Sequence, residues 1–165
     1  MKNNPGFTLI ETIIYLALFS IVIGGGMVAA FQVIQSANAS NNHIIVQEEG
    51  NFLLRKIDWA LTGAKFICVP ASGSGDILVV TQNDCFIISS LLTFDIDSGN
   101  LRLQRGNQPQ VILNSSSVAV ATSSVPAPPF LFKRDASIVT ASFKLTSVHA
   151  GKPAMQNFSI TKYLR

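Results

Sequence analysis

The sequence predicts an α+β protein in which a long N-terminal helix packs on a mainly antiparallel β-sheet head. Three observations support this fold class. An uncharged apolar run extends from Thr12 to Phe31, and an amphipathic stretch at helical spacing follows from about Ile44 to Ala64. Beyond residue 65 the pattern changes to short β segments between turn residues. The chain of 165 residues is long enough for one modest domain beside the apolar helix.

The apolar run has the length of a membrane span. From Thr12 to Phe31 there are 20 residues without a charge, which as a helix extend about 30 Å and match a bilayer core. A secretory signal peptide is one alternative, because Ala37-Asn-Ala39 resembles a cleavage site, but its apolar region would have only about 7–15 residues. A plain single-pass anchor is the other alternative. It explains the length but gives no reason for a carboxylate at Glu11.

Glu11 is the most informative residue of the chain. It lies inside otherwise apolar sequence, four residues after Phe7. A charged side chain in hydrocarbon costs a few kcal/mol or more, so such a residue usually has a function and a partner. An ammonium one helical turn away would be a suitable partner for this carboxylate at low dielectric.

The segment Gly6-Phe7-Thr8-Leu9-Ile10-Glu11 resembles the processing motif of type IV pilins and type II secretion pseudopilins. The resemblance implies that a prepilin peptidase removes the leader Met1–Gly6 and that Phe7 is then N-methylated. It also implies that Glu11 pairs with the N-terminal amine of a neighbouring subunit and so sets the register of a filament. We therefore expect Glu11 to serve subunit assembly and not catalysis.

The resemblance also implies a division of the chain and a location. We expect a leader at 1–6, a transmembrane and filament-core helix at 7–34, its amphipathic continuation at 35–64, and an extracytoplasmic β-rich head at 65–165. Lys2 precedes the apolar helix, which favours a cytoplasmic N-terminus in the inner membrane. The implied partners are prepilin peptidase, membrane lipid before assembly, an inner-membrane assembly platform and other pilin or pseudopilin subunits.

The pattern of the head resembles minor pilins and minor pseudopilins, which prime filament assembly. Two other classes remain open. One is a DNA-uptake or adhesion pilin whose head binds nucleic acid or a surface, and the other is a plain membrane-anchored β domain. The net charge of +3 is too small and too scattered to indicate a dedicated nucleic-acid surface. The choice between pilus, secretion and competence systems stays open.

The helix has two unusual stretches. Gly24-Gly25-Gly26 stands where many family members carry a proline, and each glycine costs roughly 1 kcal/mol relative to alanine. The three glycines predict either a weak point of the helix that unwinds during assembly or a place where helices pack closely. Gln35–Asn42 contains weak helix formers, which indicates a loosened connection or the N-cap of a second helix. We expect the helix to end near Gly63. Its predicted buried face contains Val46, Leu53, Ile57, Ala60 and Ala64.

The head is predicted to contain strands at 76–81, 86–89, 92–96, 101–103, 110–113, 130–132, 137–145 and 157–164. Residues 97–100, Asp-Ser-Gly-Asn, predict a hairpin turn. Residues 115–129 are predicted to be loop, because prolines at their end cannot donate to a sheet. Trp59 and Tyr163 are interpreted as core or surface packing residues and not as a platform for a ligand.

Cys68 and Cys85 are the two cysteines of the chain. Export makes a disulfide between them possible, and in the chain-entropy model a loop of about 18 residues contributes on the order of 3 kcal/mol. Two buried thiols on neighbouring strands are the alternative. We expect the disulfide, since both residues flank the segment 76–81.

The sequence contains no pattern that indicates an enzyme, a cofactor or a metal site. His43 and His149 are far apart and lack neighbouring ligands at metal-binding spacing. Asp95, Asp97 and Asn100 resemble the start of a calcium loop, but Gly106 occupies the position of the bidentate glutamate. No phosphate-binding glycine loop or nucleophile elbow is present in the sequence.

Overall fold

The computed structural model describes residues 8–122, 131–148 and 153–163. The chain divides into two compact units, Met1–Asn38 and Ala39–Arg165, and a single helix α1, Leu9–Gly63, contributes residues to both. Ten strands and one short 3₁₀ helix follow α1 in the described part of the chain. The α+β class, with a long helix followed by antiparallel sheets, is confirmed.

The first unit consists of the N-terminal part of α1. It contains an 18-residue window of mean hydropathy 2.3 in which no residue is buried. Within the described residues, α1 is the one helix that is long and apolar enough to cross a membrane. Residues 24–26 and 35–42 are helical, so the prediction of an N-cap for a separate second helix is wrong.

In the second unit, residues 39–63 of α1 are amphipathic. Four of the predicted face residues, Val46, Leu53, Ile57 and Ala60, are buried, and Ala64 packs against the core from just beyond the end of the helix. The helix ends at Gly63 as predicted. The buried face also contains residues that the sequence pattern did not select, namely Asn42, Gly50 and Leu61.

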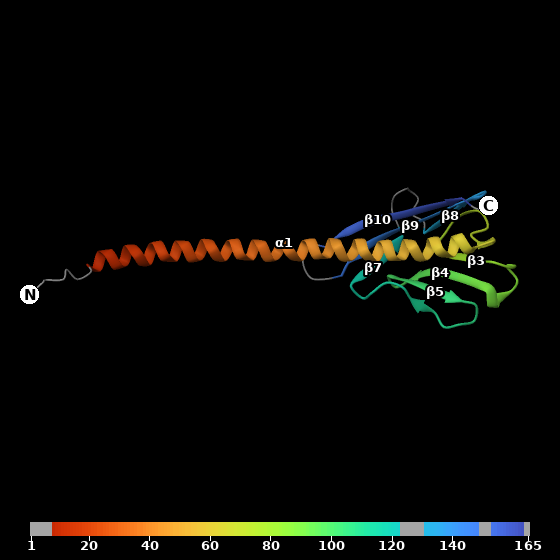
Figure 1. Cartoon of the computed structure of the whole chain (residues 1–165), viewed down its shortest axis with the longest axis horizontal. Coiled ribbons are helices and arrows are strands. Elements are labelled where there is room, and N and C mark those ends of the chain that lie inside the picture. Colours follow the sequence, from red (N-terminus) through yellow and green to blue (C-terminus); the bar gives the residue numbers. More distant parts are fainter. Residues whose placement is uncertain (1–7, 123–130, 149–152, 164–165) are drawn as a thin grey trace, which may run out of the picture. The chain divides into compact units, whose positions relative to one another are not determined.

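The strands form two antiparallel sheets (Figure 1). The first sheet has the order β1-β3-β4-β5-β6, and its strands are β1 Phe66–Val69, β3 Leu78–Thr81, β4 Leu91–Asp97, β5 Asn100–Arg105 and β6 Val111–Ile112. The second sheet has the order β10-β9-β8-β2, with β7 also paired to β9. Its strands are β2 Gly73–Gly75, β7 Val118–Thr122, β8 Phe132–Asp135, β9 Ile138–Ser147 and β10 Met155–Tyr163.

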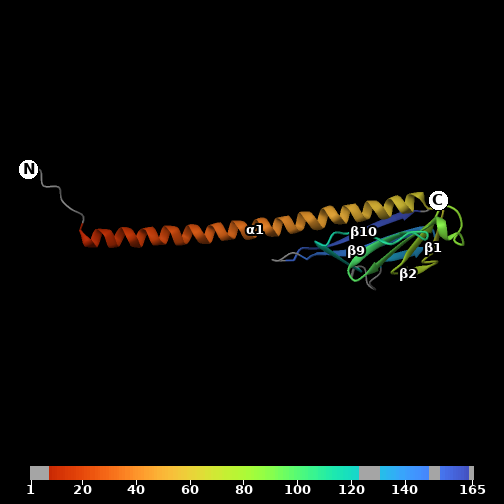
Figure 2. The same cartoon turned by 90° about the horizontal axis from the view of Figure 1, so that it is seen from below.

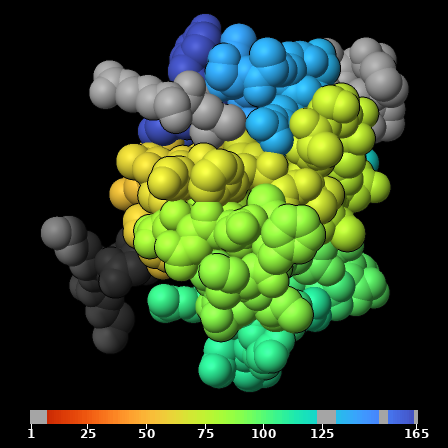
Figure 3. All heavy atoms as spheres, turned by 90° about the vertical axis from the view of Figure 1, so that its right-hand side faces the viewer, coloured from red at the N-terminus to blue at the C-terminus, as the bar shows by residue number. Residues whose placement is uncertain are grey.

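Residues 39–63 of α1 cover both sheets from one side (Figure 2). In the end view of Figure 3, the yellow end of α1 lies between the blue strands of the second sheet and the green segments of the first. Gly50 packs against the ring of Phe158 on β10, and that ring stacks on Phe143 of β9 with centroids 5.8 Å apart. Lys162 on β10 forms an ion pair of 2.7 Å with Asp58 on α1. The core residues with no exposed surface are Val46, Leu53, Ile57, Leu78, Phe94, Leu101, Leu131, Phe132, Val139, Ala141, Phe143 and Leu145.

The β4–β5 hairpin forms where the sequence predicts it. Its turn residues Ser98 and Gly99 have φ values of 51° and 79°, as a two-residue type I′ turn requires. Arg102 on β5 pairs with Asp95 and Asp97 on β4. The side-chain hydrogen bond from Arg102 to Asp95 raises the pKa of Arg102 above its ordinary value. Both carboxylates therefore interact with a guanidinium, which makes them poor candidates for calcium ligands.

Several predicted elements of the head are wrong. The segment 86–89 is a turn leading into the 3₁₀ helix η1 (Ile88–Ser90), and Phe86 is 90% exposed. Among the strands that the structure describes, none pairs with this apolar run. Residues 118–122, predicted as loop, form β7, because their alternating valines pair with β9 before the prolines begin. Strand β8 begins at Phe132, where the predicted strand ends.

Strands β1 and β2 were not predicted at all. They are short, and each is held by pairing with a strand that is not its immediate neighbour in the sequence: β1 with β3, and β2 with β8. The predicted strand at 157–164 extends to residue 164, which lies outside the described residues, as do residue 130 and residues 123–129 of the predicted loop.

Candidate processing and assembly site

Glu11 lies in the first turn of α1. Its backbone N–H donates to the carbonyl of Thr8 at 3.1 Å, which begins the helix. A carboxylate at this position is favoured by the partial positive charge of a helix N-terminus. The Tyr15 hydroxyl, one turn later on the same face, donates to Oε1 of Glu11 at 3.3 Å.

Glu11 is the only formally charged residue between Thr8 and Gln47. Large apolar side chains surround it on the helix surface, and Ile10, Ile14 and Tyr15 are all exposed. A continuous exposed apolar surface of this kind marks contact with lipid or with other protein. In either environment the carboxylate of Glu11 requires a cationic or hydrogen-bonding partner, because an unpaired charge at low dielectric is unfavourable.

Gly6 and Phe7, the predicted cleavage and methylation residues, lie outside the described residues. Of the three residues predicted to take part in processing and assembly, the structure describes Glu11, which lies on α1. Gly24, Gly25 and Gly26 are helical, and a Cβ atom added to any of them would meet no atom within 4 Å. Contacts within one subunit therefore do not require glycine at these three positions.

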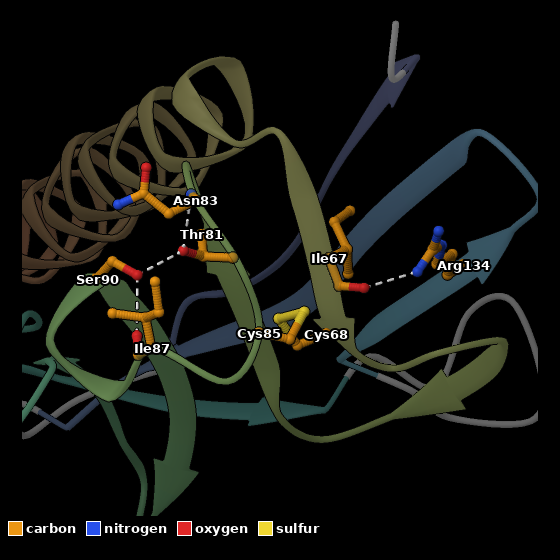
Figure 4. The surroundings of a disulfide bond; sticks show 8 residues. All are labelled: Ile67, Cys68, Thr81, Asn83, Cys85, Ile87, Ser90 and Arg134. Carbon is orange, nitrogen blue, oxygen red and sulfur yellow. Dashed lines mark hydrogen bonds between the residues drawn. A yellow bond between two sulfur atoms is a disulfide. The ribbon is translucent and has the colours of Figure 1, made fainter.

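Cys68 on β1 and Cys85 in the segment after β3 are joined by a disulfide, with Cα atoms 5.6 Å apart (Figure 4). Around it, Thr81 and Ser90 share a hydrogen bond of 2.9 Å, and the Ser90 hydroxyl also donates to the carbonyl of Ile87. Arg134 on β8 donates to the carbonyl of Ile67 at 2.8 Å, which links the two sheets. The disulfide thus ties the segment before η1 to an edge strand of the first sheet.

We expect the disulfide to stabilise the head substantially. The two cysteines are 17 residues apart, and closing a loop of that length contributes about 3 kcal/mol to the free energy of unfolding. Thermal unfolding of the purified chain with and without reductant measures the effect, and mass spectrometry should show a gain of two hydrogens on reduction. The double variant Cys68→Ser, Cys85→Ser should match the reduced protein. An unchanged mass on reduction would show that the thiols are free.

The other sequence candidates are not brought together. His43 is exposed on α1, whereas His149 lies outside the described residues. Within the ranges that the structure describes, no group of three or more His, Cys, Asp or Glu residues is arranged to hold a metal ion.

The buried Gly50 is the feature that sequence reasoning missed. The available signal was its spacing, since it lies four residues after Val46 and three before Leu53 on the apolar face.

Comparison with known proteins adds evidence for the N-terminus. Residues 1–27 match the model of the prokaryotic N-terminal methylation motif. No curated protein and no solved structure matches the chain significantly. The chain therefore carries the N-terminal methylation motif, which is the hallmark of type IV pilin and pseudopilin precursors.

The motif and the helix together fit one class of protein. A methylation motif followed by one long apolar helix fits a pilin-type subunit held by a single-pass anchor in the inner membrane. Such a motif indicates a structural subunit, processed by prepilin peptidase and assembled with other pilin subunits.

Proposed function

We propose that this protein is a minor pilin or minor pseudopilin, a subunit of a type IV pilus or a type II secretion filament. It is inserted in the inner membrane with its head outside, cut after Gly6, methylated at Phe7 and assembled through its N-terminal helix. The observation that carries the proposal is Glu11, the single carboxylate in the apolar part of α1, located five residues after the glycine of a matched methylation motif.

The chemistry of assembly follows from the charges. Before cleavage, the N-terminal segment carries Lys2, which stays in the cytoplasm. Cleavage exposes the amine of Phe7, and extraction into a filament places this amine and Glu11 in a largely apolar environment. Pairing between the Phe7 amine of one subunit and Glu11 of its neighbour neutralises both charges at one axial register. An inner-membrane assembly platform performs the extraction.

The head supports the assignment as a minor subunit. A long amphipathic stretch of α1 is followed by many short strands in two sheets, and the head is closed by a disulfide suited to an oxidising compartment. Within this proposal the chain has four parts, which are the leader 1–6, the apolar helix 7–34, its amphipathic continuation 35–64 and the head 65–165.

The direct test is the N-terminus of the mature protein. Intact mass measurement and N-terminal sequencing of protein from the native host should show a chain that begins at Phe7 and carries one added methyl group. The matched control is Gly6→Val, which places a bulky side chain at the cleavage junction and should leave the chain starting at Met1. A wild-type chain that starts at Met1, or near Ser40 after signal-peptide cleavage, would contradict the proposal.

A further inference from the structure

The second unit contains a hollow of about 400 Å³ beside the last turns of α1. Its walls come from α1, the end of β3, η1, β4 and the end of β5. The lining contains the aromatic residue Trp59 and the polar residues Thr81, Gln82, Asn83, Ser89, Ser90 and Arg105. A concave site with a few converging polar groups is the usual form of a small-molecule site.

Three of the polar side chains of this hollow are not used by the fold, whereas the hydroxyls of Thr81 and Ser90 hydrogen-bond to each other. Within the described residues, the side chains of Gln82, Asn83 and Arg105 have no hydrogen-bond or ion-pair partner. The amide nitrogen of Gln82 lies 3.3 Å from the position that a Cβ on Gly63 would occupy, so it faces the end of α1. In Figure 4 the side chain of Asn83 points away from the disulfide and toward α1.

Trp59 supplies an aromatic surface at the same place. It is 58% exposed although its neighbours Ala60 and Leu61 belong to the core. An aromatic face carries partial negative charge and attracts the C–H groups on the apolar side of a sugar ring. The amides of Gln82 and Asn83 each present donors and an acceptor, which suits the hydroxyl groups of that ring.

The charge of the hollow selects among possible ligands. Arg105 is a cation in its wall, and no aspartate or glutamate lines it. A guanidinium binds a carboxylate through two parallel hydrogen bonds, so an anionic group is favoured over a cationic one. Two neutral amides beside a single guanidinium match a ligand with many hydroxyls and one carboxylate better than a chain of phosphates.

We propose that this hollow binds an acidic saccharide, with its ring on Trp59, its carboxylate on Arg105 and its hydroxyls on Gln82 and Asn83. The site gives the head a glycan-binding activity that does not depend on how the chain is assembled. The shallow surface on the other side of Trp59, formed with Phe52, Arg55 and Lys56, lies outside the hollow and supplies matched control residues.

The fluorescence of Trp59 reports binding directly, because it is the only tryptophan of the chain. The full chain in detergent micelles is titrated separately with glucuronate, galacturonate, N-acetylneuraminate and N-acetylmuramate. At least one of these sugars should change the fluorescence saturably, with a dissociation constant in the millimolar range. A neutral sugar, glucose, should bind more weakly because it cannot pair with Arg105.

The variant Arg105→Gln should weaken binding of the acidic sugar about tenfold, since it removes a charged hydrogen-bond partner. Arg105 is exposed and its guanidinium has no hydrogen-bond or ion-pair partner within the described residues, so the fold should be unaffected. The control Arg55→Gln should leave the dissociation constant unchanged. Gln82→Ala gives a second, independent loss of affinity.

Three results would overturn the inference. The first is the absence of a saturable change with all four acidic sugars up to about 50 mM, a concentration well above a millimolar dissociation constant. The second is an equal loss of affinity in Arg55→Gln and Arg105→Gln. The third is saturable binding of thymidine 5′-phosphate without binding of any of the sugars, which would assign the hollow to a nucleotide.

Discussion

Replacing Glu11 by leucine is expected to abolish filament assembly while leaving membrane insertion and leader cleavage intact. The substitution removes the one charge of the apolar part of α1 and makes the helix more hydrophobic, so insertion should not suffer. Assembly should fail because the amine of Phe7 in the neighbouring subunit would be left without its carboxylate. Removing one partner of a buried ion pair costs about 3–5 kcal/mol, which corresponds to a loss of at least roughly a hundredfold in the assembly equilibrium.

The experiment compares sheared filament fractions with membrane fractions by immunoblotting in the native host. Intact mass measurement on the membrane fraction should show that Glu11→Leu still begins at a methylated Phe7. The control is Ser20→Val, which also removes a polar group from the apolar run. Within the described residues, the Ser20 hydroxyl donates to the carbonyl of Leu16 in its own helix, at 2.8 Å, so assembly should be unaffected by its loss. Filaments of Glu11→Leu at wild-type abundance would exclude the proposed role of this carboxylate.

Replacing Gly50 by alanine is expected to destabilise the head, although alanine is the better helix former. In an exposed helix the substitution would stabilise by about 1 kcal/mol. Here a Cβ on Gly50 would overlap the ring of Phe158, which is itself stacked on Phe143. Either α1 moves away from β10 or the ring leaves its position, and overpacking of this kind costs about 1–3 kcal/mol.

Thermal unfolding followed by near-ultraviolet circular dichroism measures this effect, and we expect the midpoint to fall by about 5 °C. Asn51→Ala, at the adjacent exposed position of α1, is the control and should change the free energy of unfolding by less than about 0.5 kcal/mol. Adding Phe158→Leu to Gly50→Ala should recover part of the loss, because the smaller side chain makes room for the methyl group. A higher midpoint for Gly50→Ala alone would mean that the helix and β10 are not in close contact.

Much of the helix was predictable because its signals are local. The charge-free run, the periodic face Val46, Leu53, Ile57 and Ala60, and the end at Gly63 each depend on residues within a few turns of one another. The β4–β5 hairpin was predictable for the same reason, since Ser98-Gly99 sets the turn between two alternating strands.

The errors lie where pairing depends on residues distant in sequence. Residues 86–89 are as apolar as a strand, yet no strand in the described part of the chain pairs with them. Strand β7 consists of small residues in a segment that ends in prolines. It is a strand because its backbone pairs with that of β9. A β-strand exists only when its backbone groups find partners, so composition alone does not decide it.

The sequence by itself determined the N-terminal part of this protein, namely a methylation motif, a carboxylate four residues after Phe7 and an apolar helix of membrane length. Each of these features depends on the order of residues along the chain and on their spacing in a helix, and both can be counted from the sequence. Only the tertiary structure decided that the strands form two sheets under one helix face, that Gly50 must lack a side chain, and that Trp59, Gln82, Asn83 and Arg105 surround one hollow. Those features depend on which distant segments come into contact, and the packing of side chains in three dimensions determines such contacts.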